Sequence, residues 1–431
     1  MNEAFLWYLW KYRLYHPAIT TTDGENISVE YPGQQNADSG PDFSHARVRI
    51  GATLWAGNVE VHTRSSDWLR HGHQNDRAFD NVILHVVYEN DVVISRPGGQ
   101  IIPVVELKDK FDSGKWEQYR RLMKSGKTIP CSSSITTISE LEMQQWLDRT
   151  LISRLERKTI YINKLLELYK GSFEEVFYQL LAANFGFKVN ALPFELLARS
   201  LEHKVLIRHS ASLLQTEALL FGQAGLLEDD FTEEYPIKLQ KEYRYLKKKL
   251  HLIGLEKKLW KFSRMHPANF PTIRISQFAV LFQKRPHILS AIIDCYKVEE
   301  LKKLFEVKAH EYWDKHFTFG EEKEALDKNL GDFAVENIII NTIVPFLFYY
   351  GKYKGDEHLC SRAVSWLEHC APENNTIIRE WSKLGVRAAS ASQSQSLIEL
   401  KNEYCVKKNC LNCRIGLKLL QQTVMVEQIN L

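Results

Sequence analysis

The sequence predicts a protein in two parts: an α/β domain over residues 1–110 and a large all-α domain over residues 139–431, joined by a linker over 111–138. Two observations support this division. Before residue 110, short apolar runs alternate with a period of two and end at turn residues, which is typical of strands. After residue 139 the apolar positions recur at helical spacing. A chain of 431 residues is also longer than one hydrophobic core usually serves.

The N-terminal domain is expected to begin with a helix over residues 3–15, because Phe5, Leu9 and Trp10 fall at helical spacing and Pro17 lies just beyond them. A helical segment is also expected over 67–80, between the third and fourth strands. The strands are expected at residues 27–31, 46–50, 53–62, 81–88, 91–95 and 101–107.

The C-terminal domain is expected to consist of helices that are punctuated by proline. The basic run 238–258 is interpreted as the solvated face of one of them. The alternative interpretation is a contact to a nucleic-acid backbone, because Tyr243 and Tyr245 lie among the lysines. The remaining helices are expected near 173–186, 193–205, 211–224, 274–284, 290–305, 322–329, 334–348, 356–370, 376–383 and 395–404.

The composition favours a folded protein of the cytoplasm. Hydrophobic residues make up 44% and charged residues 25%, which argues against extensive disorder, and a net charge of +3 gives no general signal for polyanion binding. The N-terminus lacks the pattern of a signal peptide, and no apolar run reaches the roughly 18 residues that span a bilayer, so no membrane partner is expected. Seven cysteines without such a signal indicate a reducing compartment.

The strongest candidate for chemistry is a set of acidic and basic residues on two neighbouring strands. Asp42 follows Gly40 and Pro41 and opens the strand 46–50, while Glu60 and His62 lie two apart at the end of the next strand and so share a face. Paired acids beside strands commonly hold a divalent metal for hydrolysis. The alternative is structural: an acid at a turn and a glutamate on an edge strand.

A second candidate is a set of metal-ligating side chains in the following segment. His71, His73 and Asp76, together with His62, provide ligands for Zn²⁺ or Mn²⁺ if this segment folds back over the sheet. His71 and His73 cannot share one face of a regular helix, so they would have to converge in a loop or a first turn. The alternative is surface or hydrogen-bonded core histidines, and His85, inside an apolar run, is interpreted as a core residue.

A third candidate lies near the C-terminus, where Cys405, Cys410 and Cys413 form a C-x4-C-x2-C run. In a reducing compartment such a run is better explained by a metal than by disulfides. Cys131 is the favoured fourth ligand, with Cys360 and Cys370 behind it. The group would be Zn²⁺ in a closed structural site or a [4Fe–4S] cluster. The alternative is four reduced structural cysteines.

The order of elements and acids resembles the core of the PD-(D/E)xK nuclease superfamily. Pro41-Asp42 matches the first acid, Glu60-Val61-His62 matches the second acid and its basic partner, and Glu3 would correspond to the helix glutamate of some members. The resemblance implies a restriction-endonuclease-like core with a mixed sheet, and Mg²⁺ or Mn²⁺ held by Asp42, Glu60 and the carbonyl of Val61. It also implies a nucleic-acid substrate. The family usually has lysine where this chain has His62.

Some members of that superfamily combine one distant and three clustered cysteines around an iron–sulfur cluster, although with a different spacing and order. Across nearly its full length, the chain also resembles an uncharacterised bacterial family defined only as a domain of unknown function. The stretches that carry this resemblance are Gly40–Phe43, Trp55–His62, Ser66–Trp68 with His71 and His73, Asn81–Val87, Asn184–Phe187, Phe221–Gly225, Asn269–Pro271 and the C-terminal cysteines.

Three functions are therefore expected as alternatives. The first is a metal-dependent nuclease whose helical domain binds nucleic acid or a protein partner. The second is a non-catalytic scaffold with a degenerate nuclease-like core. The third is a zinc-dependent hydrolase of a non-nucleic substrate that uses His62, His71, His73 and Asp76.

Overall fold

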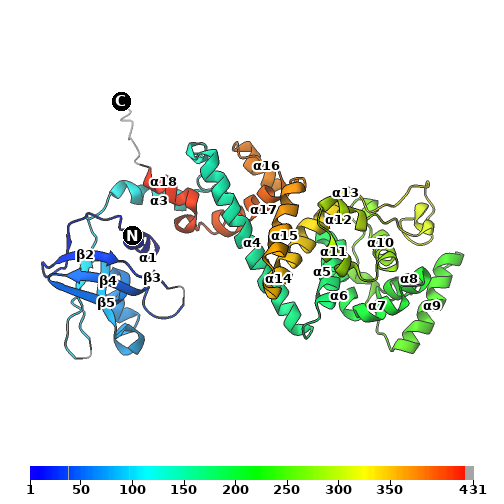
Figure 1. Cartoon of the computed structure of the whole chain (residues 1–431), viewed down its shortest axis with the longest axis horizontal. Coiled ribbons are helices and arrows are strands. Elements are labelled where there is room, and N and C mark those ends of the chain that lie inside the picture. The colour runs from blue at the N-terminus through cyan, green and yellow to red at the C-terminus, as the bar shows by residue number, and fades with distance from the viewer. Residues whose placement is uncertain (37, 97, 423–431) are drawn as a thin grey trace. The chain divides into compact units, whose positions relative to one another are not determined.

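The protein is described by a computed structural model that covers residues 1–36, 38–96 and 98–422. It divides into two compact units (Figure 1). Unit 1 comprises Met1–Trp146 together with residues 401–422, and unit 2 comprises Leu147–Leu400. The C-terminal cysteine run thus belongs with the N-terminal sheet, whereas the sequence-based boundaries place it in the helical domain.

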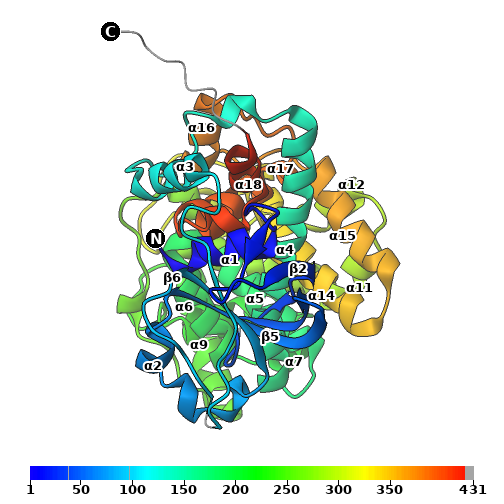
Figure 2. The ribbon, with the colours of Figure 1, turned by 90° about the vertical axis from the view of Figure 1, so that its left-hand side faces the viewer.

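Unit 1 is built on a mixed sheet, as predicted (Figures 1 and 2). In the described part of the chain the strand order is β1-β2-β4-β5-β6-β7, and β3 pairs with β4. The pairs from β1 to β5 are antiparallel, whereas β5–β6 and β6–β7 are parallel. The strands are β1 Ile19–Thr20, β2 Asn26–Tyr31, β3 Gln34–Gln35, β4 Phe43–Ile50, β5 Thr53–Arg64, β6 Val82–Glu89 and β7 Val104–Glu106.

The burial of each strand follows its sequence pattern. In β4, four apolar residues alternate with more exposed ones, so one face packs on the core. In β6, residues 82–87 are all buried, as expected of a strand that has neighbours on both edges and is covered on both faces. Helix α1 (Glu3–Lys11) contacts β5 and β6 and contributes Phe5, Leu9 and Trp10 to this core.

Several predicted elements are shorter in the structure, for local reasons. The first helix ends at Lys11 rather than residue 15, because Arg13 has a φ of +53°. The segment 67–80 forms only a short helix α2 (Asp67–Arg70) and two 3-10 turns (His73–Asn75 and Arg77–Phe79). The expected strand 91–95 was wrong: among the described residues it makes a single bridge, from Ser95 to Ile101.

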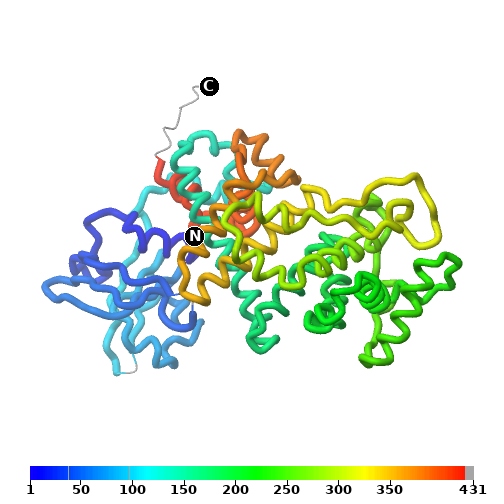
Figure 3. Tube along the Cα trace, turned by 45° about the vertical axis from the view of Figure 1, so that its right-hand side comes forward, coloured from blue at the N-terminus to red at the C-terminus, as the bar shows by residue number. Residues whose placement is uncertain are grey.

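The C-terminal segment completes the hydrophobic core of unit 1. It contains a π-helical turn (Leu400–Cys405), a 3-10 turn (Cys410–Asn412) and helix α18 (Arg414–Gln421). Leu420 is fully buried in the core of the sheet, and α18 contacts helix α3 (Ser113–Lys124), which forms within the expected linker (Figures 1 and 3). Because this core draws on both ends of the chain, unit 1 is discontinuous in sequence.

Unit 2 is largely helical, as predicted, and has its own large core. The helix expected at 322–329 was wrong: this described stretch forms no helix and takes part in two isolated β-bridges, Lys308 with Asn329 and His316 with Glu322. Helix α4 (Glu140–Leu168) begins in unit 1 and ends in unit 2. The other helices are α5 Phe173–Phe185, α6 Phe187–Ser200, α7 His203–His209, α8 Leu213–Gln223, α9 Glu234–Leu250, α10 Pro271–Lys284, α11 Ile288–Asp294, α12 Val298–Leu304, α13 Asp332–Ile338, α14 Val344–Lys354, α15 Glu357–His369, α16 Thr376–Lys383 and α17 Ala391–Glu399.

Two helical segments bear on possible partners. Helix α9 buries Leu239, Tyr243 and Leu246 and leaves its lysines exposed, so the basic run is largely a solvated face. The continuous helical segment Asp332–Lys354 is long and apolar enough to cross a bilayer, which the sequence inspection missed. However, 72% of its apolar window is buried inside the protein, as it is in core helices.

A buried carboxyl group in unit 2 makes stability depend on pH. Glu217 is fully buried and accepts hydrogen bonds from Ser276 Oγ (2.6 Å) and the Tyr235 hydroxyl, yet burial raises its pKa from 4.5 to about 7. The unfolded chain ionises first, so this stabilising contribution is complete below pH 4.5 and is lost as the pH rises through 7. Glu217→Gln should therefore gain up to about 3 kcal/mol of unfolding free energy, relative to wild type, between pH 5 and pH 8.

Urea unfolding at the two pH values measures this difference. Glu195→Gln, at a partly exposed position paired with Arg199, is the control and should show no comparable change. If the difference in unfolding free energy between wild type and Glu217→Gln is the same at both pH values, the carboxyl group of Glu217 is not protonated in the folded protein.

Candidate functional site

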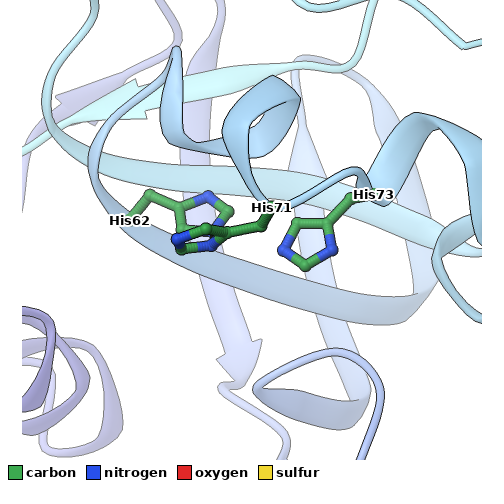
Figure 4. Close-up of side chains that lie close together, drawn as sticks. All are labelled: His62, His71 and His73. Atoms are coloured by element: carbon green, nitrogen blue, oxygen red, sulfur yellow. The ribbon is translucent and has the colours of Figure 1, made fainter.

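Strand β5 and the segment after it bring three histidines and a glutamate together. Glu60 and His62 lie two apart on β5, share a face and are both buried. The chain then leaves the strand through α2 and returns His71 and His73 to the same place. Figure 4 shows the rings of His62, His71 and His73 gathered beside one another.

The separations between these side chains suit a single metal ion. His62 Nε2 lies 3.1 Å from His71 Nδ1 and 3.5 Å from Glu60 Oε1, and His73 Nε2 lies 3.3 Å from the same oxygen. One ligand atom from each of the three rings lies within 4.8 Å of the others. With Zn–N distances of about 2.0–2.1 Å, the ligand atoms of a tetrahedral site lie roughly 3.3 Å apart. The three histidines are therefore already spaced as ligands of one ion, and Glu60 lies beside two of them, His62 and His73.

A turn rather than a helix makes this convergence possible. Helix α2 ends at Arg70, and Gly72 follows with a φ of +76°, in the left-handed region that glycine tolerates best. The reversal places His71 and His73 on one side, which a regular helix could not do. Asp76, which the sequence analysis grouped with them, accepts a hydrogen bond from the Ala78 amide at the start of a 3-10 turn and is not part of the histidine group.

Asp42 lies next to this group and is hydrogen-bonded to Glu60. The backbone N–H of Asp42 donates to Glu60 Oε2 (3.0 Å), and Asp42 Oδ2 accepts from the backbone N–H of Val61 and from Trp7 Nε1, both at 3.0 Å. The structure therefore brings Asp42, Glu60 and His62 together, as the sequence pattern suggested. Val61 contributes its amide to this contact and buries its side chain.

Burial and neighbouring charge determine the protonation of these groups. Burial, together with the neighbouring imidazoles, lowers the pKa of His62 to about 2, so its ring is neutral at physiological pH. Burial and the charge of Asp42 raise the pKa of Glu60, and burial together with the charge of Glu3 raises that of Asp42. Neutral imidazoles are the form that binds metal, and a cation would favour ionisation of both carboxyl groups.

His85 contacts the ring of His62 from the neighbouring strand. It is fully buried on β6, pairs in register with Glu60, and places Nε2 2.9 Å from His62 Nδ1. Metal-bound histidines usually have such a partner on their second ring nitrogen. His73 Nε2 is buried and has no hydrogen-bond partner among the described residues, which fits a nitrogen that serves as a metal ligand.

The prediction that His85 is a core residue is confirmed, since it is fully buried, but its contact with His62 was not predicted. The sequence gives no direct signal for the contact between His62 and His85, because that contact depends on the register between the parallel strands β5 and β6. Glu3, at the start of α1, also belongs to these surroundings, since its charge raises the pKa of both Asp42 and Glu60.

The four predicted cysteines gather elsewhere in unit 1. Cys131, Cys405, Cys410 and Cys413 are all buried and free of disulfides. Burial raises the pKa of Cys405, and the other three thiols raise it further, so all four lie within electrostatic reach of one another. The two other candidates for the fourth ligand, Cys360 and Cys370, lie in unit 2, in α15 and at its end.

Replacing His85 tests its supporting role. His85→Phe keeps a ring in the core but removes the nitrogen next to His62, so binding of Zn²⁺ or Mn²⁺ should weaken by about 10–100-fold. Isothermal titration calorimetry on the metal-stripped protein measures this. His16→Ala, at an exposed position, is the control and should bind like wild type. Unchanged affinity in a folded His85→Phe protein would exclude the supporting role.

Comparison with known proteins identifies the family of the chain. No curated protein and no solved structure matches it. One family profile matches residues 3–376, which include the sheet, the histidine group and most of the helical unit. The chain therefore belongs to the family DUF2851, described as a protein of unknown function.

Proposed function

We propose that this protein is a divalent-metal-dependent hydrolase that cleaves phosphodiester bonds in nucleic acid. The observation that carries the proposal is the convergence of Glu60, His62, His71 and His73, with Asp42 hydrogen-bonded to Glu60. Glu60 and His62 are buried, whereas His73 is partly buried and His71 is exposed. Ligating side chains that converge in this way from a strand and a separate loop indicate a functional site.

The order and direction of the elements also support a nuclease-like core. Helix α1 precedes three antiparallel strands (β2, β4 and β5), and the α2 segment then leads to β6, which is parallel to β5. The PD-(D/E)xK resemblance implies this succession. Asp42 lies directly before the second of these strands and Glu60 in the third, where the resemblance requires the two acids.

The side chains divide into ligands and a candidate base. Glu60 Oε1 faces His62 and His73 while Oε2 is held by the Asp42 amide, so the carboxylate is fixed in one orientation. A divalent ion bound there would act as a Lewis acid towards a phosphoryl oxygen and lower the pKa of water. Asp42 uses Oδ2 for both of its hydrogen bonds. Its Oδ1 makes none with the described residues and is available to accept a proton from the attacking water.

A pocket next to this site suits a nucleic acid. It has a volume of about 270 Å³ and is bordered by α1 and the loop before α18, both in unit 1. Trp7 lines it and also donates to Asp42, so the pocket lies next to the proposed catalytic acid. Aromatic rings stack on bases, and ammonium groups neutralise phosphates. The aromatic and basic residues that line it are Trp7, Tyr8, Tyr12, Lys11, Lys407 and Lys408.

The replacement of the usual lysine by His62 shifts the expected metal. Three imidazoles and one carboxylate favour Zn²⁺ or Mn²⁺ over Mg²⁺, which prefers oxygen ligands. The same donor set favours a second candidate function, a zinc-dependent hydrolase of a non-nucleic ester or amide. The two candidates differ in substrate, not in the metal site.

The test uses the full chain, stripped of metal and reloaded separately with Zn²⁺, Mn²⁺ and Mg²⁺. Each form is incubated with single-stranded DNA, duplex DNA, RNA, bis-p-nitrophenyl phosphate and p-nitrophenyl acetate. We expect cleavage of a nucleic acid with Mn²⁺ or Zn²⁺, inhibition by EDTA, and the same rate in the His16→Ala control. Turnover of p-nitrophenyl acetate alone would favour the second candidate. Stoichiometric metal binding without any turnover would overturn both.

A further inference from the structure

We propose that Cys131, Cys405, Cys410 and Cys413 bind an iron–sulfur cluster that fastens the C-terminal segment to unit 1. This centre is separate from the histidine site, and the inference does not depend on the proposed hydrolysis. It rests on the spacing of the cysteines, on their convergence in the fold and on the groups that surround their sulfur atoms.

The spacing matches a known iron–sulfur pattern. Cys405, Cys410 and Cys413 form a C-x4-C-x2-C run, and a fourth cysteine comes from a distant part of the chain. Plant-type ferredoxins hold their cluster with the same three-cysteine spacing and a distant fourth cysteine. Structural zinc sites more often combine two separate ligand pairs. Three thiols in one loop with one from elsewhere therefore favour a cluster over a single zinc ion.

The fold brings the four thiols together from separate elements. Cys405 ends the π-helical turn, Cys410 opens the 3-10 turn, and Cys413 is the N-cap of α18. Cys131 lies in a turn before α4, and its neighbours Pro130 and Ser133 line one pocket with Leu420 of the C-terminal segment. Burial and the nearby thiols of Cys413 and Cys410 raise the pKa of Cys131 to about 12. All four residues are less than one-tenth exposed. Together they make a buried site supplied only with sulfur ligands.

A close backbone contact holds the cysteine loop in shape. A Cβ atom on Gly416 would lie 2.2 Å from the backbone carbonyl oxygen of Cys410, so only glycine allows helix α18 to approach the loop this closely. The cysteine loop and the start of α18 therefore hold a fixed arrangement relative to each other.

Burial raises the pKa of the thiols, and some neighbouring groups partly offset that rise. For Cys413 these are the backbone N–H groups of Gly416 and Ile415 and the indole of Trp146. The ammonium groups of Lys401 and Lys408 act in the same way on Cys405 and Cys410, respectively. Hydrogen bonds to the sulfurs of an iron–sulfur cluster tune its potential and stabilise its negative charge.

The cluster would have a structural role in this unit. It connects the turn at Cys131 to the segment 401–422, which contributes Leu411, Leu417 and Leu420 to the core of the sheet. Lys407 and Lys408, within the cysteine loop, line the pocket beside α1. Loss of the cluster should therefore release the C-terminal segment and leave the ligands on β5 in place.

The experiment is to purify the full chain without oxygen and measure iron, acid-labile sulfide, zinc and the visible absorption spectrum. We expect a brown protein with iron and sulfide in equal amounts, about two or four of each per chain. Cys413→Ser and Cys131→Ser should each lose at least half of the iron and the visible absorption. Cys360→Ser, outside the group, should retain both.

If the cysteine variants fail to fold, the wild-type protein supplies a second measurement. Removal of iron with a chelator should bleach the absorption and expose the segment 401–422 to limited proteolysis, and reconstitution with iron and sulfide should restore protection. Zinc without iron, or the absence of both metals from folded protein that also fails to reconstitute, would overturn the cluster. So would full retention of iron in Cys413→Ser. None of these readouts uses the hydrolytic activity, so failure of this inference and failure of the proposed function can be told apart.

Discussion

Glu60→Gln should remove metal binding at the histidine group while the protein stays folded. The substitution keeps the size of the side chain and an oxygen that can accept from the Asp42 amide, but it deletes the carboxylate that lies 3.3 Å from His73 Nε2 and 3.5 Å from His62 Nε2. Losing the only charged ligand of the group should weaken binding of Zn²⁺ or Mn²⁺ by at least about 100-fold, and any hydrolysis should fall by about 1000-fold or more.

Thermal unfolding gives a readout that does not depend on a substrate. At a metal concentration of 100 times Kd, wild type should gain about 2.7 kcal/mol of unfolding free energy, whereas Glu60→Gln should gain close to none. In the absence of metal the variant should be at least as stable as wild type, because a buried, desolvated carboxyl group has been replaced by a neutral amide.

Glu30→Gln is the matched control, because Glu30 lies on the exposed part of the same sheet, where it pairs with Arg49. It should show the wild-type gain in melting temperature on addition of metal. If Glu60→Gln also shows that gain, the ion does not bind at this group, and the proposed function loses its main support.

Glu399→Gln should cause the largest loss of stability among single, size-conserving changes in unit 2. Glu399 is 2% exposed and pairs with Arg154 at 3.3 Å and with Arg157 at 2.7 Å, while Arg154 also donates to Gln395. Arg154 is only 9% exposed, and removing the charged partner from a buried ion pair costs about 3–5 kcal/mol. This network ties α4 to α17 within unit 2.

Urea unfolding at neutral pH measures this loss, and Glu195→Gln again provides the comparison. The Glu195–Arg199 pair is a partly exposed i,i+4 pair, so its loss should cost less than about 0.5 kcal/mol. A loss of similar size for both substitutions would mean that water reaches the Glu399 network and screens it.

The local sequence pattern was sufficient to predict most elements of the fold. Alternating apolar residues predicted β4 and β5, the continuous apolar run predicted β6, and the helical periodicity after residue 139 predicted a helical unit. These predictions succeed because burial of one face is decided by residues close together in sequence. Boundaries were less accurate where one residue reverses the chain, as Gly72 does after α2.

The candidate residues were also visible in the sequence, but their arrangement was not. Asp42, Glu60 and His62 could be grouped from strand spacing alone. The place of His85 beside His62 depends on the register of two parallel strands that a separate segment connects. Asp76 looked equivalent to His71 and His73 in sequence, yet it caps a turn instead.

By itself, the sequence determined which residue types are available and which local structure each one adopts. Only the tertiary structure decided that 401–422 belongs with the sheet, because the hydrophobic core of unit 1 is completed by Leu420 and its neighbours from the far end of the chain. The same long-range packing brings Cys131 to the C-terminal cysteines. The physical reason is that the hydrophobic effect is non-directional and does not depend on how far apart two residues are in the sequence. Contacts between distant segments therefore depend on how the whole core packs, which no local pattern shows.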